Sequence, residues 1–200
     1  MRLFTLRFSA PPTPEEERLL RRLLLPGIVP RTPESLYAWA LLGLALGGKD
    51  LPAAAREPSG KPYFPDAPEL CFSLSHTHGA VLAALSDRPV GADLERLRTP
   101  PPRLARRFGL EGEDFFRSWV RREARGKRTG EGVTAQLRAE TAMESGERFG
   151  YVETFPGYVA GVSAMEEVPE RAERYSVTAL LTAAEQRSQN QEGKKRRRET

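Results

Sequence analysis

The sequence predicts an α+β protein made of two similar lobes, a pseudo-dimer in which each lobe packs helices on a small, mostly antiparallel sheet. Each half of the 200-residue chain shows helical segments beside about three strand-like runs. A proline cluster at Pro100–Pro102 separates the halves, since proline continues neither a helix nor a central strand. We therefore expect an N-terminal lobe over residues 1–100, a C-terminal lobe over 101–185 and a basic, disordered tail over 186–200.

The N-terminal lobe begins with a strand over its first eight residues, in which apolar side chains alternate. Two helices follow, because Thr13 and Thr32 each stand as an N-cap before a proline at the first helical position. The first helix ends at Pro26-Gly27 and the second at Gly47-Gly48. Residues 52–69 are rich in proline and small residues, which predicts an irregular connection. Strands are then predicted at 70–75, 80–85 and 90–95.

The C-terminal lobe is predicted to begin with a short helix at 104–108 and a longer one from about Asp114 to Arg128. The turn residues Thr129–Gly132 end the longer helix. Residues 186–200 show no apolar periodicity, so we expect them to be disordered. Strand candidates lie at 133–139, 149–155, 158–165 and 175–180.

The net charge of the chain is concentrated at its C-terminus. Lys and Arg number 31 against 27 Asp and Glu, which gives a net charge of +4. Residues 186–200 alone carry six basic and two acidic side chains, so residues 1–185 are neutral as a whole. The high isoelectric point therefore describes the tail, and we do not expect the body of the protein to bind nucleic acid.

Three features predict a cytoplasmic protein. No apolar run approaches the ~18–20 residues that span a bilayer, so we expect no membrane partner. The N-terminus lacks the apolar core of a signal peptide. Cys71 is the single cysteine, which excludes an internal disulfide framework and a cysteine-rich zinc site.

Two carboxylates stand close together in the run Val90-Gly91-Ala92-Asp93-Leu94-Glu95. In an extended strand, residues two apart point to the same side, so Asp93 and Glu95 are expected to lie next to each other. Their mutual repulsion is relieved by a hard divalent cation such as Mg²⁺, which prefers oxygen ligands. A solvent-facing strand edge would carry the same pattern, so the residues alone leave both interpretations open.

A second polar cluster, Ser73–His78, lies at the end of a predicted strand. A histidine beside serines offers N–H and O–H donors that suit a phosphate. His76 and His78 would also suit a metal ion, although the chain has no third histidine. A polar surface loop is the remaining alternative.

A third cluster, Trp119–Lys127, lies on the longer helix of the second lobe. Glu123 and Lys127 are four residues apart with the acid first, the favourable order for an ion pair on an exposed helix face. Trp119 is typical of a core residue, and Gly60-Lys61-Pro62 is typical of a turn. Taken singly, each of these features has a purely structural explanation.

Taken together and in order, these motifs resemble those of the Sfp-type 4′-phosphopantetheinyl transferases. The family pattern runs GKP, F-[NS]-[IL]-S-H-[ST], V-G-[IV]-D-[IL]-E, R-F…E and W-x-x-K-E-[AS]-x-x-K. The chain has, in the same order, Gly60-Lys61-Pro62, Phe72–Thr77, Val90–Glu95, Arg107-Phe108 with Glu113, and Trp119–Lys127. Phe155–Val162 is similar to the closing strand pair of the family, so the resemblance covers residues 1–185 or nearly so.

The resemblance implies transfer of the 4′-phosphopantetheine group of coenzyme A to a serine of an apo acyl or peptidyl carrier protein. Mg²⁺ is the implied cofactor and coenzyme A the co-substrate. Glu123 is expected to act as general base, with Lys127 as the second catalytic residue. The implied metal ligands are Asp93, Glu95 and Glu113. Contacts with the phosphates and the nucleotide are expected from Lys61, Ser75, His76 and Arg31.

The chain departs from the family pattern on the longer helix. Arg122 stands where the family has lysine, which keeps the charge but changes the hydrogen-bond geometry. Gly126 costs the helix about 1 kcal/mol relative to alanine. These two residues leave an inactive family member that binds carrier or coenzyme A as an alternative, and the basic tail leaves a nucleic-acid-binding protein as another. Glu111 competes with Glu113 as a metal ligand.

A docking surface for the carrier protein is predicted beside the strand that carries Asp93 and Glu95. The resemblance implies carrier proteins that present an acidic helix next to the modified serine. Arg103, Arg106 and Arg107 follow the proline cluster on a short predicted helix, and they are our candidates for the matching basic surface. We expect the protein to act as a monomer.

Overall fold

The central strands form two larger sheets in the residues that the computed structural model describes, 1–47, 51–131 and 142–196. The N-terminal sheet has the strand order β4 (Cys71–Thr77), β5 (Ala80–Ser86), β1 (Arg2–Arg7) and β9 (Glu173–Tyr175). The C-terminal sheet has the order β6 (Val90–Arg96), β8 (Tyr158–Ala164) and β7 (Arg148–Tyr151). Neighbouring strands are antiparallel, except that β9 runs parallel to β1. The α+β class is confirmed.

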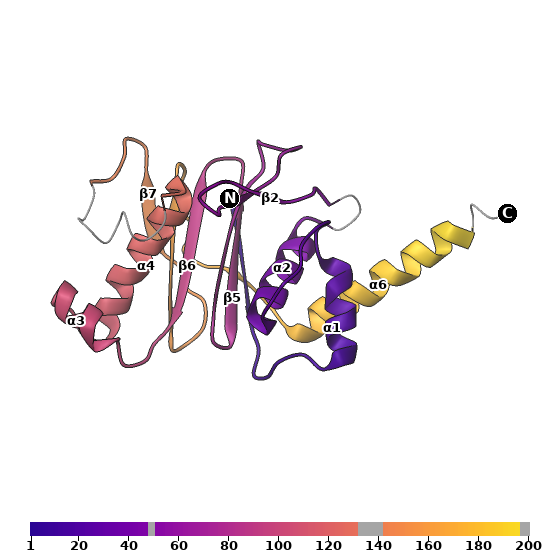
Figure 1. The fold of residues 1–200 in the computed structure, drawn as a ribbon, viewed down its shortest axis with the longest axis horizontal. Coiled ribbons are helices and arrows are strands. Elements are labelled where there is room, and N and C mark those ends of the chain that lie inside the picture. The colour runs from indigo at the N-terminus through magenta and orange to yellow at the C-terminus, as the bar shows by residue number, and fades with distance from the viewer. Residues whose placement is uncertain (48–50, 132–141, 197–200) are drawn as a thin grey trace.

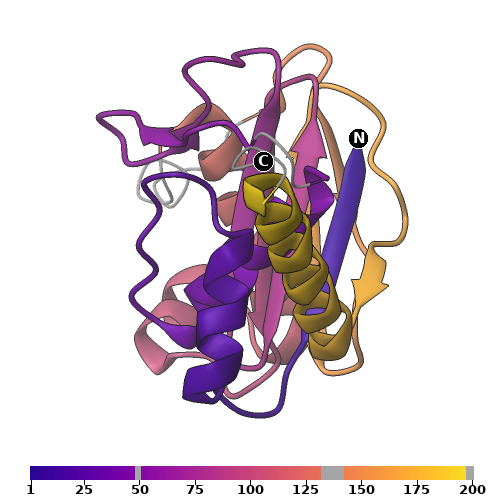
Figure 2. The same ribbon diagram turned by 90° about the vertical axis from the view of Figure 1, so that its right-hand side faces the viewer.

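Helices cover the outer face of the N-terminal sheet (Figure 1). These are α1 (Pro14–Leu20), the 3₁₀ turn η1 (Arg21–Leu23), α2 (Pro33–Ala45) and α6 (Val177–Arg196). Thr13 and Thr32 cap α1 and α2 as predicted, since each hydroxyl accepts a hydrogen bond from the backbone N–H three residues on. Phe4 of β1 and Leu180 of α6 belong to the core that these helices bury against the sheet. Figure 2 shows α6 lying alongside α1.

The C-terminal sheet is covered by α4 (Gly112–Thr129), against which α3 (Pro102–Phe108) packs, and both helices lie on the opposite side of the molecule from α2 (Figure 1). Both helices begin and end close to their predicted positions. Phe115, Phe116 and Val120 of α4 pack on Val159 of β8 in a separate apolar cluster. This packing holds α4 along β6 and β8, with which it makes extensive contact.

The two sheets meet where β4 runs beside β6. The Ser73 hydroxyl accepts a hydrogen bond from the Ala92 N–H at 2.9 Å, and the Ser75 hydroxyl accepts one from the Leu94 N–H at 3.1 Å. Serine side chains thus satisfy backbone donors of β6 that no strand pairs on this side. Leu82 of β5 and residues of β6 and β8 also share one apolar cluster, so the sheets have a common core.

The connection at 52–69, expected to be irregular, contains the short hairpin of β2 (Ala55–Arg56) and β3 (Pro62–Tyr63). The Glu57 N–H donates to the Lys61 carbonyl at 2.9 Å, which closes the turn of this hairpin. The predicted Gly60-Lys61-Pro62 turn therefore lies at its tip.

Two C-terminal segments differ from prediction. The strand predicted at 175–180 is the end of β9 followed by the start of α6, because the Ser176 hydroxyl accepts from the Ala179 N–H and caps a helix. The tail predicted as disordered from 186 continues α6 to Arg196, since Leu180 and Ala184 anchor the helix in the core and straight-chain side chains favour its extension. The strand candidate at 133–139 lies outside the described residues. None of the helices in the described ranges is apolar enough along its length to cross a membrane.

The lobe boundary after residue 100 remains a prediction. Elements from each side of this boundary pair with strands on the other side. β6 precedes the proline cluster, yet it pairs with β8 of the C-terminal sheet. β9 and α6 come late in the chain, yet they join the N-terminal sheet and its helices. Strand β6, which carries Asp93 and Glu95, is therefore covered by helix α4. It also lies beside strand β4 of the N-terminal sheet.

Gly91 allows α4 to lie directly on β6, and its replacement should be costly. A Cβ added at Gly91 would lie 2.0 Å from the Ala124 carbonyl oxygen and 2.3 Å from the Arg128 backbone nitrogen. We expect Gly91→Ala to lower the free energy of unfolding by about 1–3 kcal/mol or more, measured by urea denaturation, because α4 must move away from the strand. Gly27→Ala is the comparison, since its Cβ would meet open space and its cost is only that of an alanine in a left-handed backbone at φ +77°. A smaller loss for Gly91→Ala than for Gly27→Ala would contradict this packing argument.

Candidate active site

Asp93 lies at the centre of the candidate site, where β6 faces β4 and α4. The residue is buried, with 5% of its surface exposed. Its Oδ1 accepts hydrogen bonds from the Ser75 hydroxyl at 2.8 Å and from the Lys127 ammonium at 2.7 Å. Two elements, β4 and α4, therefore each bring one side chain to a single carboxylate oxygen of β6.

Ser75 acts as a brace at this point. Its hydroxyl donates to Asp93 and accepts from the Leu94 N–H at 3.1 Å and from the Lys127 ammonium at 3.1 Å. A hydroxyl has one donor and two acceptor positions, so all of them are used. In this structure Ser75 fixes the position of Asp93 and Lys127, and its contact with phosphate remains a prediction.

The second oxygen of Asp93, Oδ2, is buried and has no hydrogen-bond partner in the part of the chain that the structure describes. Glu95 lies two residues further along β6 and forms an ion pair with Arg98 at 2.7 Å. Burial raises the pKa of Glu95, the Arg98 hydrogen bond lowers it, and the Asp93 charge raises it again, with a net upward shift. Asp93 and Glu95 thus act on each other electrostatically, as their spacing predicts.

Glu123 projects from α4 one turn before Lys127. Burial raises its pKa to about 7, helped by the charges of Asp93 and Glu95 and opposed by Lys127. A carboxylate in this range holds and releases a proton near neutral pH, which is what a general base requires. The structure therefore gives the sequence-predicted base an environment that suits proton transfer.

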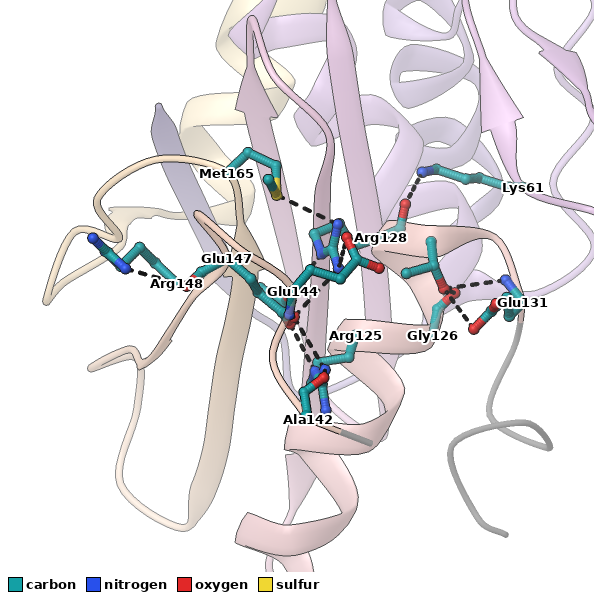
Figure 3. Close-up of polar contacts among 12 residues, drawn as sticks. Lys61, Arg125, Gly126, Arg128, Glu131, Ala142, Glu144, Glu147, Arg148 and Met165 are labelled. Carbon is teal, nitrogen blue, oxygen red and sulfur yellow. Dashed lines mark hydrogen bonds and ion pairs between the residues drawn. The ribbon is translucent and has the colours of Figure 1, made fainter. Parts of the chain in front are cut away.

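His76 lies near Lys127 and Asp93, whereas Lys61 lies near Glu57 and Arg128. Withdrawal from water and the Lys127 charge lower the pKa of His76, so the neutral imidazole is favoured at neutral pH. Burial lowers the pKa of Lys61, whose ammonium donates to the Arg128 carbonyl at 2.5 Å at the end of α4 (Figure 3). His76 can offer a neutral N–H donor, whereas Lys61 ties the hairpin tip to α4.

Curated proteins similar to this chain share one name. The chain is 34% identical over 103 residues to 4′-phosphopantetheinyl transferase psf-1 of Bacillus pumilus, covering 44% of each protein. It is 26% identical over 151 residues to 4′-phosphopantetheinyl transferase Sfp of Bacillus subtilis strain 168, covering 61% of this chain and 67% of Sfp. A further 4′-phosphopantetheinyl transferase of Bacillus subtilis is 26% identical over 92 residues, which are 39% of this chain and 41% of the relative.

The chain is a relative of the 4′-phosphopantetheinyl transferases. The resemblance found in the motifs is confirmed. The chain spans less than half the length of two of these transferases in the matched regions. No protein-family model matches the chain.

Glu113, which the transferase motifs suggested as a metal ligand, stands at the other end of α4 from Lys127, the partner of Asp93. It stands in the first turn of α4, half-exposed, and pairs with Arg117 at 3.3 Å. Ten residues of helix separate it from Glu123, a distance of about 15 Å at 1.5 Å per residue. Within the described ranges, no three His, Cys, Asp or Glu side chains are grouped so that they could hold a metal ion.

Arg31 lies at a different place in the fold. It lines a cavity of about 280 Å³ at the start of α2, together with Arg21, Glu17 and several prolines. The hydrogen bonds and ion pairs found for the described residues do not link it to Asp93 or Lys127. Its contact with a coenzyme A nucleotide remains a prediction.

The two departures from the transferase pattern have structural partners. Arg122 lies over the Phe108 ring of α3, with its guanidinium carbon 5.0 Å from the ring centre. Gly126 is buried in α4, and its carbonyl accepts the Gly130 N–H at 3.0 Å where the helix ends. Neither residue breaks α4, which continues to Thr129.

Sequence reasoning missed two residues that shape the site. Arg98 pairs with Glu95, and a basic residue three positions after an acidic strand was available as a signal. Ser73 bonds β6 to β4 beside Ser75, and the alternation of the two serines in Phe72–Ser75 was the corresponding signal. Both act from the edge of the site.

Proposed function

We propose that the protein transfers the 4′-phosphopantetheine group of coenzyme A to a serine hydroxyl of an apo acyl or peptidyl carrier protein. The names of the curated relatives support this activity. The observation that carries it is the grouping of Asp93, Lys127 and Glu123, in which a half-buried carboxylate with a pKa of about 7 lies beside a cation and a second acid. Such a carboxylate can take the proton of a hydroxyl group, and the neighbouring cation can attract a phosphate.

Each residue has a defined task in the reaction. Glu123 accepts the proton of the carrier serine, whose oxygen then forms a bond to the β-phosphorus of coenzyme A. The bond from that phosphorus to the oxygen bridging to the α-phosphate breaks, and 3′,5′-adenosine bisphosphate leaves with the electron pair. Lys127, held by Asp93, presents its positive charge to the phosphates. The neutral ring of His76 donates a hydrogen bond to a phosphate oxygen.

Mg²⁺ fits the donors at the acidic strand. Asp93 Oδ2 is a buried oxygen without a hydrogen-bond partner among the described residues, and Glu95 offers a second carboxylate on the same strand. Hard cations of this type take oxygen ligands. Asp93 and Glu95 would hold the ion, which when bound offsets negative charge on the pyrophosphate.

Mass spectrometry of a carrier protein tests the proposal directly. An apo carrier incubated with coenzyme A, Mg²⁺ and this protein should gain the mass of one phosphopantetheine group. A carrier whose modified serine is replaced by alanine is the control. An unchanged mass for fatty-acid, polyketide and peptide carriers alike would contradict the proposed activity.

Arg103, Arg106 and Arg107 lie exposed on α3 and form the proposed carrier-docking surface. Single exposed ion pairs are worth about 0–1 kcal/mol, so the joint field of the three should act on encounter with an acidic partner. Reversing all three to Glu should raise KM for the carrier, flatten its salt dependence and leave KM for coenzyme A unchanged. Steady-state kinetics at several salt concentrations measure this effect.

A matched control changes the same number of charges elsewhere. Arg2, Arg171 and Arg174 are also exposed, and their joint reversal gives the same net charge. If the α3 triple variant has the carrier KM of the wild type at low salt, or if the control triple raises it equally, α3 is not the docking surface.

A further inference from the structure

A buried ion pair joins Arg125 of α4 to Glu147 (Figure 3). The Arg125 guanidinium of α4 donates two hydrogen bonds to Glu147, from Nε to Oε1 at 2.7 Å and from Nη2 to Oε2 at 3.0 Å. Arg125 is 4% exposed and Glu147, which stands just before β7, is 2% exposed. The pairing is therefore bidentate and shielded from water, the geometry that fixes arginine most firmly.

Further groups complete the hydrogen bonding of Glu147. The Ser163 hydroxyl of β8 donates to Oε1 at 2.9 Å, and the Glu144 N–H donates to Oε2 at 2.9 Å. Burial alone would raise the pKa of Glu147, but the hydrogen bonds from Arg125, Glu144 and Ser163 outweigh it and lower the pKa to about 2. Arg128 Nε donates to Ser163 at 3.0 Å, so a second arginine of α4 joins the same network.

The network holds α4 on the side of the helix opposite Glu123 and Lys127. Successive residues of a helix are about 100° apart, so Arg125, two residues from both Glu123 and Lys127, lies about 160° round the axis from each. Lys127 is tied to Asp93 and Ser75 on one side, while Arg125 is tied to Glu147 on the other. Rotation of α4 about its axis would break one set of bonds or the other.

Such a network does little for net stability. The desolvation of two buried charges offsets most of their attraction, and apolar residues of similar volume can replace such a pair without loss of folding. What apolar residues do not supply is direction, because their contacts tolerate small rotations that a bidentate pair resists. A displacement of 1 Å at a reacting group can cost about 10²-fold in rate.

We propose that Arg125 and Glu147, joined by Ser163, are positioning residues that fix the rotation of α4 and so hold Glu123 and Lys127 in register with Asp93. This inference rests on the proposed transferase function. It explains why an arginine occupies the inner face of α4, next to Gly126, where an apolar residue would suffice for packing.

The first test replaces the ion pair by apolar residues. The double variant Arg125→Met/Glu147→Leu should fold with a thermal midpoint close to that of the wild type, yet lose about 10- to 100-fold in kcat with KM for coenzyme A within twofold. Arg125→Lys keeps the charge but not the bidentate contact, so its kcat should lie between those of the wild type and the double variant. Glu144→Gln is the matched control, because Glu144 is exposed and pairs with Arg128 only at the edge of the network.

A double-variant cycle tests whether the network acts through Lys127. Lys127→Met alone should lose activity, and Arg125→Met/Glu147→Leu should cost clearly less in that background than in the wild type, because only the positioning of Glu123 is then left to lose. Losses that multiply would show a general structural effect and overturn the inference. A double variant that folds and keeps a kcat within twofold of the wild type would also overturn the inference. Where the double variant does not fold, Glu147→Gln takes its place in both measurements.

A crystal structure of the folded variant gives a readout that does not depend on turnover. The Lys127 Nζ–Asp93 Oδ1 contact, 2.7 Å in the native protein, should be lost in it. If the wild type modifies no carrier, the proposed function fails, and this structure alone decides the inference. An unshifted α4 with the contact intact would then contradict it.

Discussion

Replacing Glu123 by glutamine should lower kcat for carrier modification by about 10²- to 10⁴-fold while leaving KM for coenzyme A near its wild-type value. Glutamine has the size and polarity of glutamate but cannot accept the serine proton. Glu123 has a pKa raised to about 7, mainly by burial, so an appreciable fraction of it is ionised and ready at neutral pH. Steady-state kinetics with one carrier measure the effect. A loss well below tenfold would show that Glu123 is not the base and would favour a metal-bound water in that role.

The same substitution should change stability in a way that depends on pH. The folded-state pKa of about 7 lies above the ordinary value of 4.5, so the folded protein keeps a proton that the unfolded chain releases between these pH values. Stability is therefore lost as pH rises through this window. Glu123→Gln should be more stable than the wild type at pH 8 by about 1–3 kcal/mol and nearly equal to it at pH 5.

Urea denaturation in the presence of a chelator measures this difference without interference from metal ions. Glu153→Gln is the control, because Glu153 is exposed on the surface, where it pairs with Arg171 and Arg174. The control should show the same small difference at both pH values. If Glu123→Gln and the wild type were equally stable at pH 8, the folded protein would not raise the pKa of Glu123.

Asp93→Ala should abolish Mg²⁺-dependent transfer, and Glu95→Ala should do the same. Each substitution removes an oxygen donor and no apolar core volume, so the fold should persist, as circular dichroism can check. Asp93 has the larger part, because its Oδ1 holds Lys127 while its buried Oδ2 lacks a partner among the described residues. Transfer measured over a range of Mg²⁺ concentrations, at saturating coenzyme A, reports the loss.

Asp93→Asn separates the two roles of this carboxylate. Asparagine keeps an oxygen for the Ser75 and Lys127 hydrogen bonds but removes the charge that attracts a cation. Calorimetry should therefore show weakened Mg²⁺ binding in a protein with near-native stability. Full activity of the alanine variants, or undiminished wild-type activity in excess chelator, would refute the metal assignment.

Local signals predicted most of the elements. Thr13 and Thr32 cap their helices as expected, and the strand at 90–95 forms as β6. These features depend on hydrogen bonds and steric preferences within a few residues, which a sequence displays directly. The end of the chain was harder, because α6 is stabilised by Leu180 and Ala184 packing on distant helices.

The candidate site was predicted in part. Asp93, Glu123 and Lys127 were named from their motifs, and the structure brings their charges together. The phosphate contact assigned to Ser75 remains a prediction, whereas the hydrogen bonds by which its hydroxyl joins β6 to α4 appear only in the structure. Glu113 and Glu123 stand ten residues apart on one predicted helix, so about 15 Å of helix between them was already deducible from the sequence.

The sequence by itself determined which residue types this protein carries, where α1 to α4 begin to within a few residues, and which transferase motifs stand in order along the chain. The tertiary structure alone decided that β6 leaves the first half to join β8, and that Arg125 meets Glu147 behind the reactive face of α4. Caps and strand patterns are set by neighbours in sequence. Sheet partners and buried ion pairs depend instead on how distant segments pack, because a buried charge is stable only where the whole fold supplies its partner.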